Sequence, residues 1–425
     1  MMRELTFGWP THQLTDDPRL AYNSISKTYC RMIYESLLDI DPDTGALLPW
    51  LATSWRYRDP LTLDLSIRSD RHFSDGTPLT PVTVAQSFSD IVALKQVSPL
   101  PAAVTMLTGL DRIETGAEGV TFRFVRHNAA FLRSLASVNL AIRKAPGLGT
   151  ARWRPVAGGV TDGCQRLMFR EADTGDVYAG RVDGYHVAEL HNPGISYGLC
   201  PNASRGPMAD PRVRHALTLL IDRPALKPIL DAYGYTVASS VLTPTTGCYR
   251  DFSAELAYDP PTAHRLLDAA GAQELSFEVV FNSSFSPIDA AILTAVAAQW
   301  KQHGIELILV DVDFPELRSR QQSGDYDFRF FYFTGSDPDL LRYQFAVTQR
   351  NMNRRTGTDR LDTMLDAQLT CADPHARGEL VHDIQHRILT GGLWLPLCNV
   401  RTVTSYRPGG LSGIHLDTEA LARIP

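Results

Sequence analysis

The feature that most constrains the fold is an alternation of strand-like and helix-like segments between residues 275 and 333. In the first segment apolar residues recur at every second position, which is typical of a β-strand with one buried face. In the next they recur at helical spacing, on Ile292, Val296 and Trp300. The full order is strand 275–281, helix 287–303, strand 305–312, helix 314–323 and strand 327–333. Strands joined by helices run parallel with right-handed crossovers, so this order predicts an α/β sheet.

The carboxyl ends of these strands are the expected place for a ligand. Open α/β sheets bind ligands beyond those ends, and here the ends are polar, at 282–284, Asp313 and 334–337. Aromatic and charged residues beside them suit a small ligand that carries a carboxylate or an amine. Together with two residues of an early loop, the predicted ligand-binding residues are Tyr22, Asn23, Arg329, Tyr332, Thr334, Ser336 and Asp337. For Arg329 and Asp337, a structural ion pair stays the alternative.

The rest of the chain also mixes strands and helices. Alternating apolar residues at 61–67 and 120–124 predict strands with one buried face. Thr80-Pro81, Asp210-Pro211 and Asp259-Pro260 each combine an N-cap residue with proline at the first helical position, which predicts three helix starts. The overall fold class is therefore α/β.

Charge and hydropathy exclude several classes of protein. The 425 residues include 41 Lys plus Arg and 47 Asp plus Glu, for a net charge of −6, and a weakly acidic chain is poorly suited to neutralise nucleic-acid phosphates. No apolar stretch reaches the ~20 residues of a membrane span. Residues 1–9 show no apolar leader. As written, the sequence indicates a cytoplasmic protein; it would act in the periplasm or at the cell surface if a leader had been removed.

Three motifs invite a catalytic or metal-binding interpretation, and each has a simpler explanation. The segment 194–198 matches G-x-S-x-G but lacks the helix that follows a nucleophile elbow. His382 and His386 are one helical turn apart, but Asp383 stands where zinc proteases have Glu, and no third ligand is evident. The six cysteines contain no CxxC and fit buried thiols, with disulfides only in an exported protein. We expect no catalytic residues, no metal and no cofactor.

Several stretches resemble one protein family. They are IYESLL at 33–38, DPDTG at 41–45, LPWLATSW at 48–55, FSDGTPLT at 73–80, DPRVRHAL at 210–217, YDP at 258–260 and SGDYD at 323–327. On these residues the chain resembles the dipeptide-, oligopeptide- and nickel-binding proteins of ABC transporters, known as extracellular solute-binding family 5. It looks like a shortened member of that family without a visible signal peptide.

The resemblance implies a periplasmic-binding-protein-like fold with two hinged α/β lobes and an extra β-rich domain. It assigns residues 1–35, 145–205 and 400–425 to the first lobe, 36–144 to the extra domain and 206–399 to the second lobe. The lobes would close on the ligand by a hinge motion. The implied function is to bind a small peptide, a peptide-like metabolite or a chelate in an interlobe cleft and deliver it to an ABC permease. We expect a monomer with no membrane insertion.

Two departures from the family pattern bear on the ligand. The stretch between the turn at 147–150 and the helix at 210 is short for the family, so we expect a trimmed first lobe. Peptide-binding members carry an acidic residue just after the strand that corresponds to 326–333, where this chain has Thr334. Two other functions stay open. One is a cytoplasmic sensor that acts through another protein, and the other is an enzyme recruited from the same fold.

Overall fold

The computed structural model forms two compact units. It describes residues 3–9, 14–41, 44–97, 101–172, 174–189, 195–283, 288–335, 337–400, 403–408, 413–416 and 422–424. Contacts between Cα atoms separate unit 1, comprising Met1–Leu190, Leu369–Pro374 and Thr402–Pro425, from unit 2, comprising His191–Gln368 and His375–Arg401. Each unit is described by itself below.

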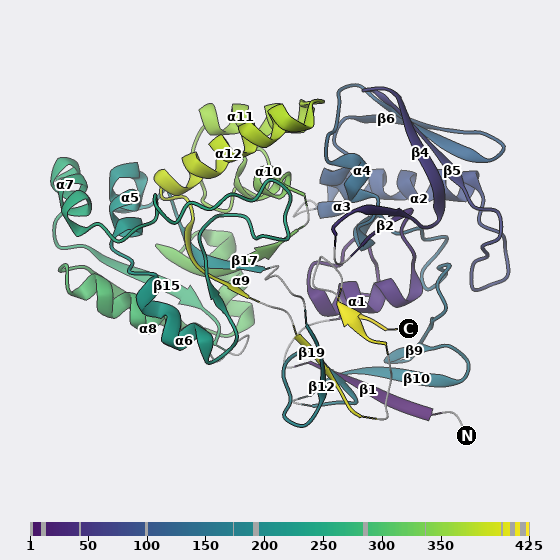
Figure 1. The fold of residues 1–425 in the computed structure, drawn as a ribbon, viewed down its shortest axis with the longest axis horizontal. Coiled ribbons are helices and arrows are strands. Elements are labelled where there is room, and N and C mark those ends of the chain that lie inside the picture. Colours follow the sequence, from purple (N-terminus) through teal and green to yellow (C-terminus); the bar gives the residue numbers. More distant parts are fainter. Residues whose placement is uncertain are drawn as a thin grey trace. The chain divides into compact units, whose positions relative to one another are not determined.

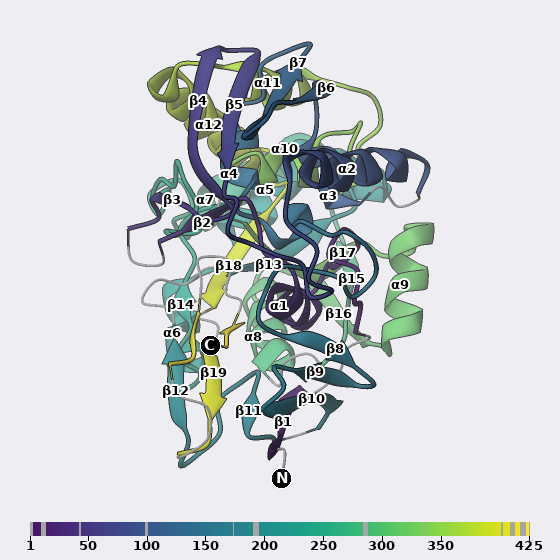
Figure 2. The same ribbon diagram turned by 90° about the vertical axis from the view of Figure 1, so that its right-hand side faces the viewer.

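Unit 1 contains a seven-stranded sheet in the order β12-β19-β11-β1-β10-β9-β8. Its strands are β1 (Arg3–Trp9), β8 (Arg154–Val156), β9 (Gly159–Thr161), β10 (Gln165–Glu171), β11 (Val177–Tyr178), β12 (His186–Glu189) and β19 (Val403–Tyr406). Strand β1 runs parallel to β10 and β11, and the other pairs are antiparallel. Helix α1 (Ser24–Ile33) contacts β8 and β9 and shares their hydrophobic core (Figures 1 and 2).

A second part of unit 1 is the β-rich segment predicted from the alternating pattern. Strands β4 (Ala52–Asp59), β5 (Thr62–Ile67), β7 (Gly119–Phe124) and β6 (Leu110–Thr115) form an antiparallel sheet in that order. Helix α2 (Pro81–Val92) shares their core through Val84, Phe88 and Ile91. Thr80 caps α2 in a capping box, as its sequence predicts. The shorter elements are β2 (Leu38–Ile40), β3 (Leu47–Pro49), α3 (Ala102–Met106), α4 (Phe131–Ser134), β20 (His415–Leu416), β21 (Ala422–Arg423) and 3₁₀ turns at Ala93–Gln96 and Val138–Leu140.

Unit 2 is built on a six-stranded sheet in the order β14-β18-β13-β17-β15-β16. Its strands are β13 (Ile195–Pro201), β14 (Thr236–Val237), β15 (Ser276–Phe281), β16 (Glu306–Asp311), β17 (Phe328–Thr334) and β18 (Leu395–Val400). Strand β15 is parallel to both β16 and β17, which confirms the predicted crossover topology. Strands β13, β14 and β18 pair antiparallel.

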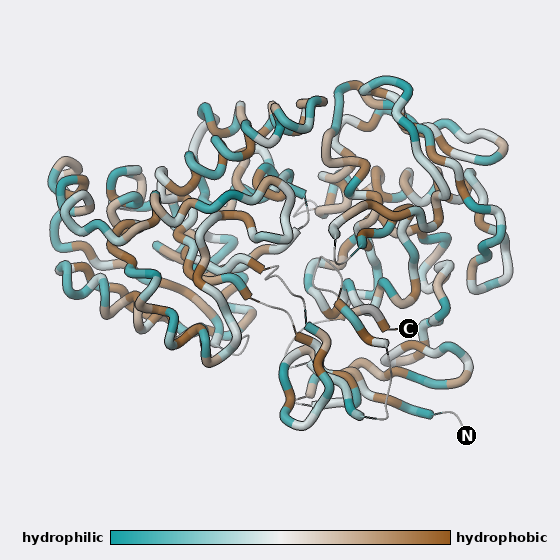
Figure 3. The backbone as a smooth tube through the Cα atoms, viewed as in Figure 1, coloured by the Kyte–Doolittle hydropathy of each residue, from teal (hydrophilic) through white to brown (hydrophobic). Residues whose placement is uncertain are grey.

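Helices fill in around this sheet. They are α5 (Pro211–Leu219), α6 (Lys227–Asp231), α7 (Pro260–Ala270), α8 (Ile288–Lys301), α9 (Phe314–Ser323), α10 (Leu340–Phe345), α11 (Arg360–Thr370) and α12 (Pro374–Thr390), with 3₁₀ turns at Gly206–Ala209 and Pro224–Leu226. Brown and teal alternate along α8 in Figure 3, as expected of a helix with one buried side. One core joins α5, α7 and α8 to the sheet, and another gathers α10, α11 and α12 around Trp394.

Most predicted element boundaries in unit 2 agree with the structure within two residues. Asp210 and Asp259 cap α5 and α7 as predicted, and Gly271 ends α7 in the left-handed conformation. The α/β class and the periplasmic-binding-protein-like fold are confirmed. Strand β13 lies in the sheet of unit 2, although the sequence assigned residues up to 205 to the first lobe. The reason is its backbone pairing with β17 and β18. Residues 36–144 fall in unit 1 together with the seven-stranded sheet.

All six cysteines are free thiols, and Cys30, Cys200 and Cys398 are buried. In the described part of the chain, no helix has the length and apolar character that a bilayer crossing requires.

A close backbone approach at Gly149 generates a stability prediction. A Cβ at this buried position would lie 1.9 Å from the carbonyl oxygen of Ile33, so the backbone would have to shift. We expect Gly149→Ala to lower the free energy of unfolding by about 1–3 kcal/mol, the usual cost of overpacking. Gly116→Ala is the control, because its Cβ meets only an ordinary contact at 3.7 Å. Urea denaturation of both variants checks this; equal midpoints would contradict the account.

Histidines near the C-terminus of α8 generate a pH prediction. His303 Nε2 lies 2.8 Å from the Tyr258 hydroxyl, and its Nδ1 lies 3.2 Å from His264 Nε2. Burial, together with the charge of His264, lowers the pKa of His303 below its usual value near 6.5. Folding therefore favours the neutral ring, so this stabilisation is complete above pH ~6.5 and is lost as the pH falls below that value. We expect His303→Gln to flatten the pH dependence of the midpoint between pH 7.5 and 5.5, whereas His186→Gln in unit 1 leaves it unchanged. Identical slopes in His303→Gln and wild type would contradict it.

Candidate functional site

The carboxyl ends of β15, β16 and β17 form one edge of the sheet of unit 2, here called the carboxyl edge. Because β13 and β18 alternate in direction, the start of β13 and the end of β18 reach the same edge. Ile195 of β13 pairs with Thr334 of β17 on one side and with Val400 of β18 on the other. The edge therefore gathers residues from five strands.

Polar residues at the ends of β15 and β16 hold these strands together. The Asn282 side-chain amide donates to the Val312 carbonyl at 2.7 Å. The Ser283 backbone N–H and hydroxyl donate to the Asp311 carboxylate at 3.0 and 2.5 Å. Their hydrogen bonds close the crossover loops, so Asp311 is already engaged by the protein. Ser284 and Ser336 lie outside the described residues.

Two of the predicted ligand-binding residues, Tyr332 and Thr334, lie on the same face of β17 at the carboxyl edge, since alternate residues of a strand share a face. Both are half-buried. The Tyr332 ring stacks on Tyr197 with centroids 5.0 Å apart and planes 20° apart. Burial, followed by the Asp289 charge, raises the pKa of Tyr197 well above its usual value. This phenol therefore stays neutral and keeps its proton for hydrogen bonding.

The opposite face of the same edge carries two unsatisfied polar groups. Ser196 and Asn399 face each other across β13 and β18 and are only 0% and 3% exposed. Neither the Ser196 hydroxyl nor the Asn399 side-chain carbonyl has a hydrogen-bond partner. Buried polar groups are nearly always paired with protein, water or ligand. This pair marks the edge as a place where a further polar partner is accommodated.

A group of threonine hydroxyls adjoins the end of β17, which the sequence did not single out. The Thr246 hydroxyl donates to the Gly335 carbonyl at 2.7 Å. The Thr243 hydroxyl lies 2.9 Å from that of Thr245 and 3.2 Å from that of Thr246. The only sequence signal for this group is a polar turn at 243–247, which resembles many loops.

Asp337 is held in an ion pair. Its carboxylate accepts from Arg377 at 2.7 and 3.2 Å, and the two side chains are 17% and 12% exposed. Burial opposes the charge of Arg377, but the Asp337 carboxylate outweighs this effect and raises the pKa of Arg377. Gln368 links Arg377 to Asp339 by further hydrogen bonds. The structural ion pair, which was the alternative interpretation of Asp337, is what the structure shows.

The remaining predicted residues lie elsewhere. Tyr22 is in unit 1 and is 58% exposed. Asn23 is the N-cap of α1, and its side-chain oxygen accepts from the Ser26 backbone N–H at 2.8 Å. Arg329 is buried near the start of β17, away from the carboxyl edge. It has no ion-pair partner among the described residues, so the ion-pair alternative for Arg329 does not hold.

The described residues offer no obvious catalytic chemistry at this edge. Ser196 lies within a regular strand, which agrees with the simpler explanation of the G-x-S-x-G match. Burial raises the pKa of the Cys398 thiol, which keeps it protonated and unreactive. No group of three or more His, Cys, Asp or Glu side chains in the described ranges is arranged to hold a metal ion. Stacked rings and hydroxyl groups bind and orient a small molecule.

Comparisons with known proteins agree with this geometry. The family model of bacterial extracellular solute-binding proteins, family 5 (middle region), matches residues 167–353. The nickel-binding periplasmic protein of Escherichia coli K12 is 22% identical over 95% of this chain and 90% of its own length. A probable di/tripeptide-binding protein of Pseudomonas aeruginosa UCBPP-PA14 is 27% identical over 53% of this chain and 44% of its own length.

A solved structure supports the same fold. NikA from Brucella suis, in complex with Fe(III)-EDTA, superposes with a TM-score of 0.81 and 19% identity, covering 99% of this chain and 100% of that chain. The family match within the chain, the relatives that align along it and the shared fold all agree with the resemblance seen in the sequence. The chain therefore belongs to family 5 of the bacterial extracellular solute-binding proteins.

Proposed function

We propose that the protein binds a small peptide, a peptide-like metabolite or a metal chelate at the carboxyl edge of unit 2 and delivers it to an ABC permease. Family membership supports solute binding for a permease. Relatives named for nickel and for di- and tripeptides support the range of solute classes. Hinged closure of two lobes on the solute stays a prediction from the family resemblance.

The observation that carries this proposal is the pairing of ligand-suited groups on both faces of one sheet edge. Tyr332 and Thr334 offer a half-buried ring and a hydroxyl. Ser196 and Asn399 offer buried polar groups without partners. A solute that covers the edge would gain stacking with the ring and hydrogen bonds to polar groups that otherwise stay unsatisfied.

The charges at the edge bear on the class of solute. Asp311 accepts hydrogen bonds from Ser283, and Asp337 is paired with Arg377. Neither carboxylate is therefore available to hold a free amino group without losing its present partner. Thr334, at the position where peptide-binding members carry an acid, offers a hydroxyl. We therefore favour a peptide-like metabolite or a chelate whose end at this edge is neutral or anionic.

We also infer that the protein acts outside the cytoplasm. The curated relative from Escherichia coli is described as periplasmic. Delivery of a solute to an importing permease requires the binding protein on the outer side of the membrane. Cell fractionation of the native protein, with a cytoplasmic enzyme as the marker, tests this location.

The solute-binding proposal predicts the effect of removing the ring at the edge. Native mass spectrometry of gently purified protein identifies a retained solute; otherwise the calorimetric panel is dipeptides, tripeptides, Ni(II)–histidine and Fe(III)–EDTA. We expect Tyr332→Ala to weaken binding roughly tenfold, because one lost ring stack is worth about 1 kcal/mol beyond its buried area. Tyr258→Ala, an exposed tyrosine elsewhere in unit 2, is the control. Equal affinities of Tyr332→Ala and wild type would contradict binding at this edge.

The ion pair at Asp337 predicts a loss of stability rather than of affinity. Asp337→Asn leaves the Arg377 guanidinium poorly compensated, so we expect the free energy of unfolding to fall by about 1–3 kcal/mol. Solute affinity of the folded variant should stay near the wild-type value. The matched control is Asp231→Asn, whose partner Lys227 is exposed and whose pair contributes less than about 1 kcal/mol. A large loss of affinity without a loss of stability would make Asp337 a ligand anchor instead.

A further inference from the structure

Four arginines of unit 2 lack a carboxylate partner, which sets them apart from their neighbours. They are Arg318, Arg329, Arg350 and Arg354, here called the arginine cluster, and none forms an ion pair with any described residue. The next residue, Arg355, pairs with both Asp359 and Asp362. In a chain with more acidic than basic residues, a group of unpaired cations is an exception that needs a physical reason.

Two members of the cluster stack on one aromatic ring. The guanidinium carbons of Arg329 and Arg350 each lie 4.6 Å from the ring centroid of Phe331. Arg329 is 5% exposed and donates from Nη2 to the Met352 carbonyl at 3.2 Å, while its Nε is buried without a partner. Arg350 is exposed in part and donates to the Gln344 side chain at 3.0 Å. Contacts with an aromatic face support these cations but do not neutralise them.

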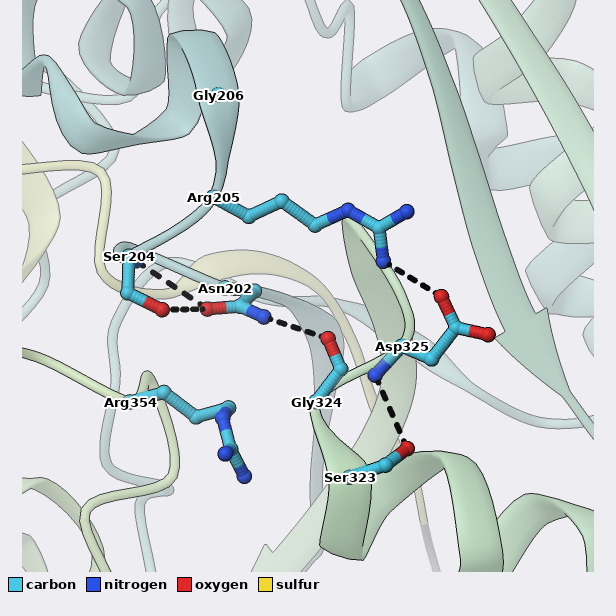
Figure 4. A pocket seen from close by; sticks show the side chains of 8 residues that line it. All are labelled: Asn202, Ser204, Arg205, Gly206, Ser323, Gly324, Asp325 and Arg354. Atoms are coloured by element: carbon cyan, nitrogen blue, oxygen red, sulfur yellow. Dashed lines mark hydrogen bonds and ion pairs between the residues drawn. The ribbon is translucent and has the colours of Figure 1, made fainter.

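A third member, Arg354, opens onto a pocket of about 490 Å³. It holds a left-handed backbone conformation, with φ of 54°, and donates to the carbonyls of Gln321 and Gln322 at the end of α9. Figure 4 shows its side chain at this pocket with Asn202, Ser204 and Ser323. Arg205 across the pocket is different, because it is paired with Asp325 at 2.9 Å. Among the pocket arginines, Arg354 is thus the one without a carboxylate.

Electrostatics link the members of the cluster. Burial, followed by the charges of Arg329 and Arg318, lowers the pKa of Arg350 to about 10. Burial raises the pKa of Tyr326, and the charges of Arg329, Arg354 and Arg350 oppose that shift, which places the three cations around one phenol. At pH 7 all these guanidinium groups stay charged and repel one another. An anion among them would relieve this repulsion and provide an acceptor for the Arg329 Nε.

We propose that the arginine cluster is a binding site for a doubly charged oxyanion, either inorganic phosphate or the phosphoryl group of a small metabolite. Guanidinium groups bind such oxygens with paired, charge-assisted hydrogen bonds. The site lies at the start of β17, and Arg329 is five residues before Thr334, or roughly 16 Å along the strand. It is therefore separate from the carboxyl edge, and a pocket of this size accommodates a metabolite as well as the free ion.

Titration with phosphate at low millimolar concentration and constant ionic strength, adjusted with NaCl, tests the proposal. Calorimetry with inorganic phosphate and with glycerol 3-phosphate distinguishes the two sources of the phosphoryl group. We expect saturable binding to wild type and a loss of affinity of roughly tenfold or more in Arg350→Gln, because one charged hydrogen-bond donor is removed. The exposed position of Arg350 makes a folding defect in this variant unlikely to arise from core disruption.

Two further variants keep the outcome decisive. Arg265→Gln removes another exposed arginine of unit 2 that has no carboxylate partner, bonded only to the Thr262 hydroxyl, and should bind phosphate as wild type does. Arg329→Lys keeps the buried charge but loses the guanidinium geometry, and should weaken binding while remaining folded by circular dichroism. A flat wild-type isotherm, or equal phosphate affinity in wild type and Arg350→Gln, would overturn the proposal. Because phosphate stabilises many proteins non-specifically, a melting shift shared by all variants counts against it as well.

Discussion

The position of β17 in the middle of the sheet of unit 2 is the constraint on which the rest of the site depends. It pairs parallel with β15 on one side and antiparallel with β13 on the other. This register fixes which residues reach the carboxyl edge and which lie at the opposite end. Thr334 is brought beside Ile195, and the Tyr332 ring is brought onto Tyr197. The strand thus presents hydroxyl and ring groups at one end and a guanidinium at the other.

The balance between paired and unpaired charges separates structural residues from candidate binding residues. Removing a charge from water costs free energy that a well-placed partner offsets. Arg377 has such a partner in Asp337, and Arg342 has one in Asp339, so these pairs are explained by the fold. Arg329 has a ring and a carbonyl but no carboxylate. The same criterion applies to neutral groups, and it singles out Ser196 and Asn399 among the residues of the carboxyl edge.

Local sequence signals predicted much of the fold, because they depend on neighbouring residues. Asp210 and Asp259 began helices where expected, and the spacing of Ile292, Val296 and Trp300 indicated the buried side of α8. The predicted Tyr332 and Thr334 do lie together at a strand end. What the sequence could not reveal were partners that only the tertiary fold supplies. Arg377 is 40 residues from Asp337, and Ser196 meets Asn399 only because β13 and β18 become neighbours in the sheet.

The most direct test of solute binding at the carboxyl edge is a crystal structure of the protein with its retained or titrated solute. The account predicts density for the solute in contact with Tyr332 and Thr334, with a polar group or ordered water reaching Ser196 or Asn399. A solute bound elsewhere, with these four residues unchanged and without contact to it, would contradict the account.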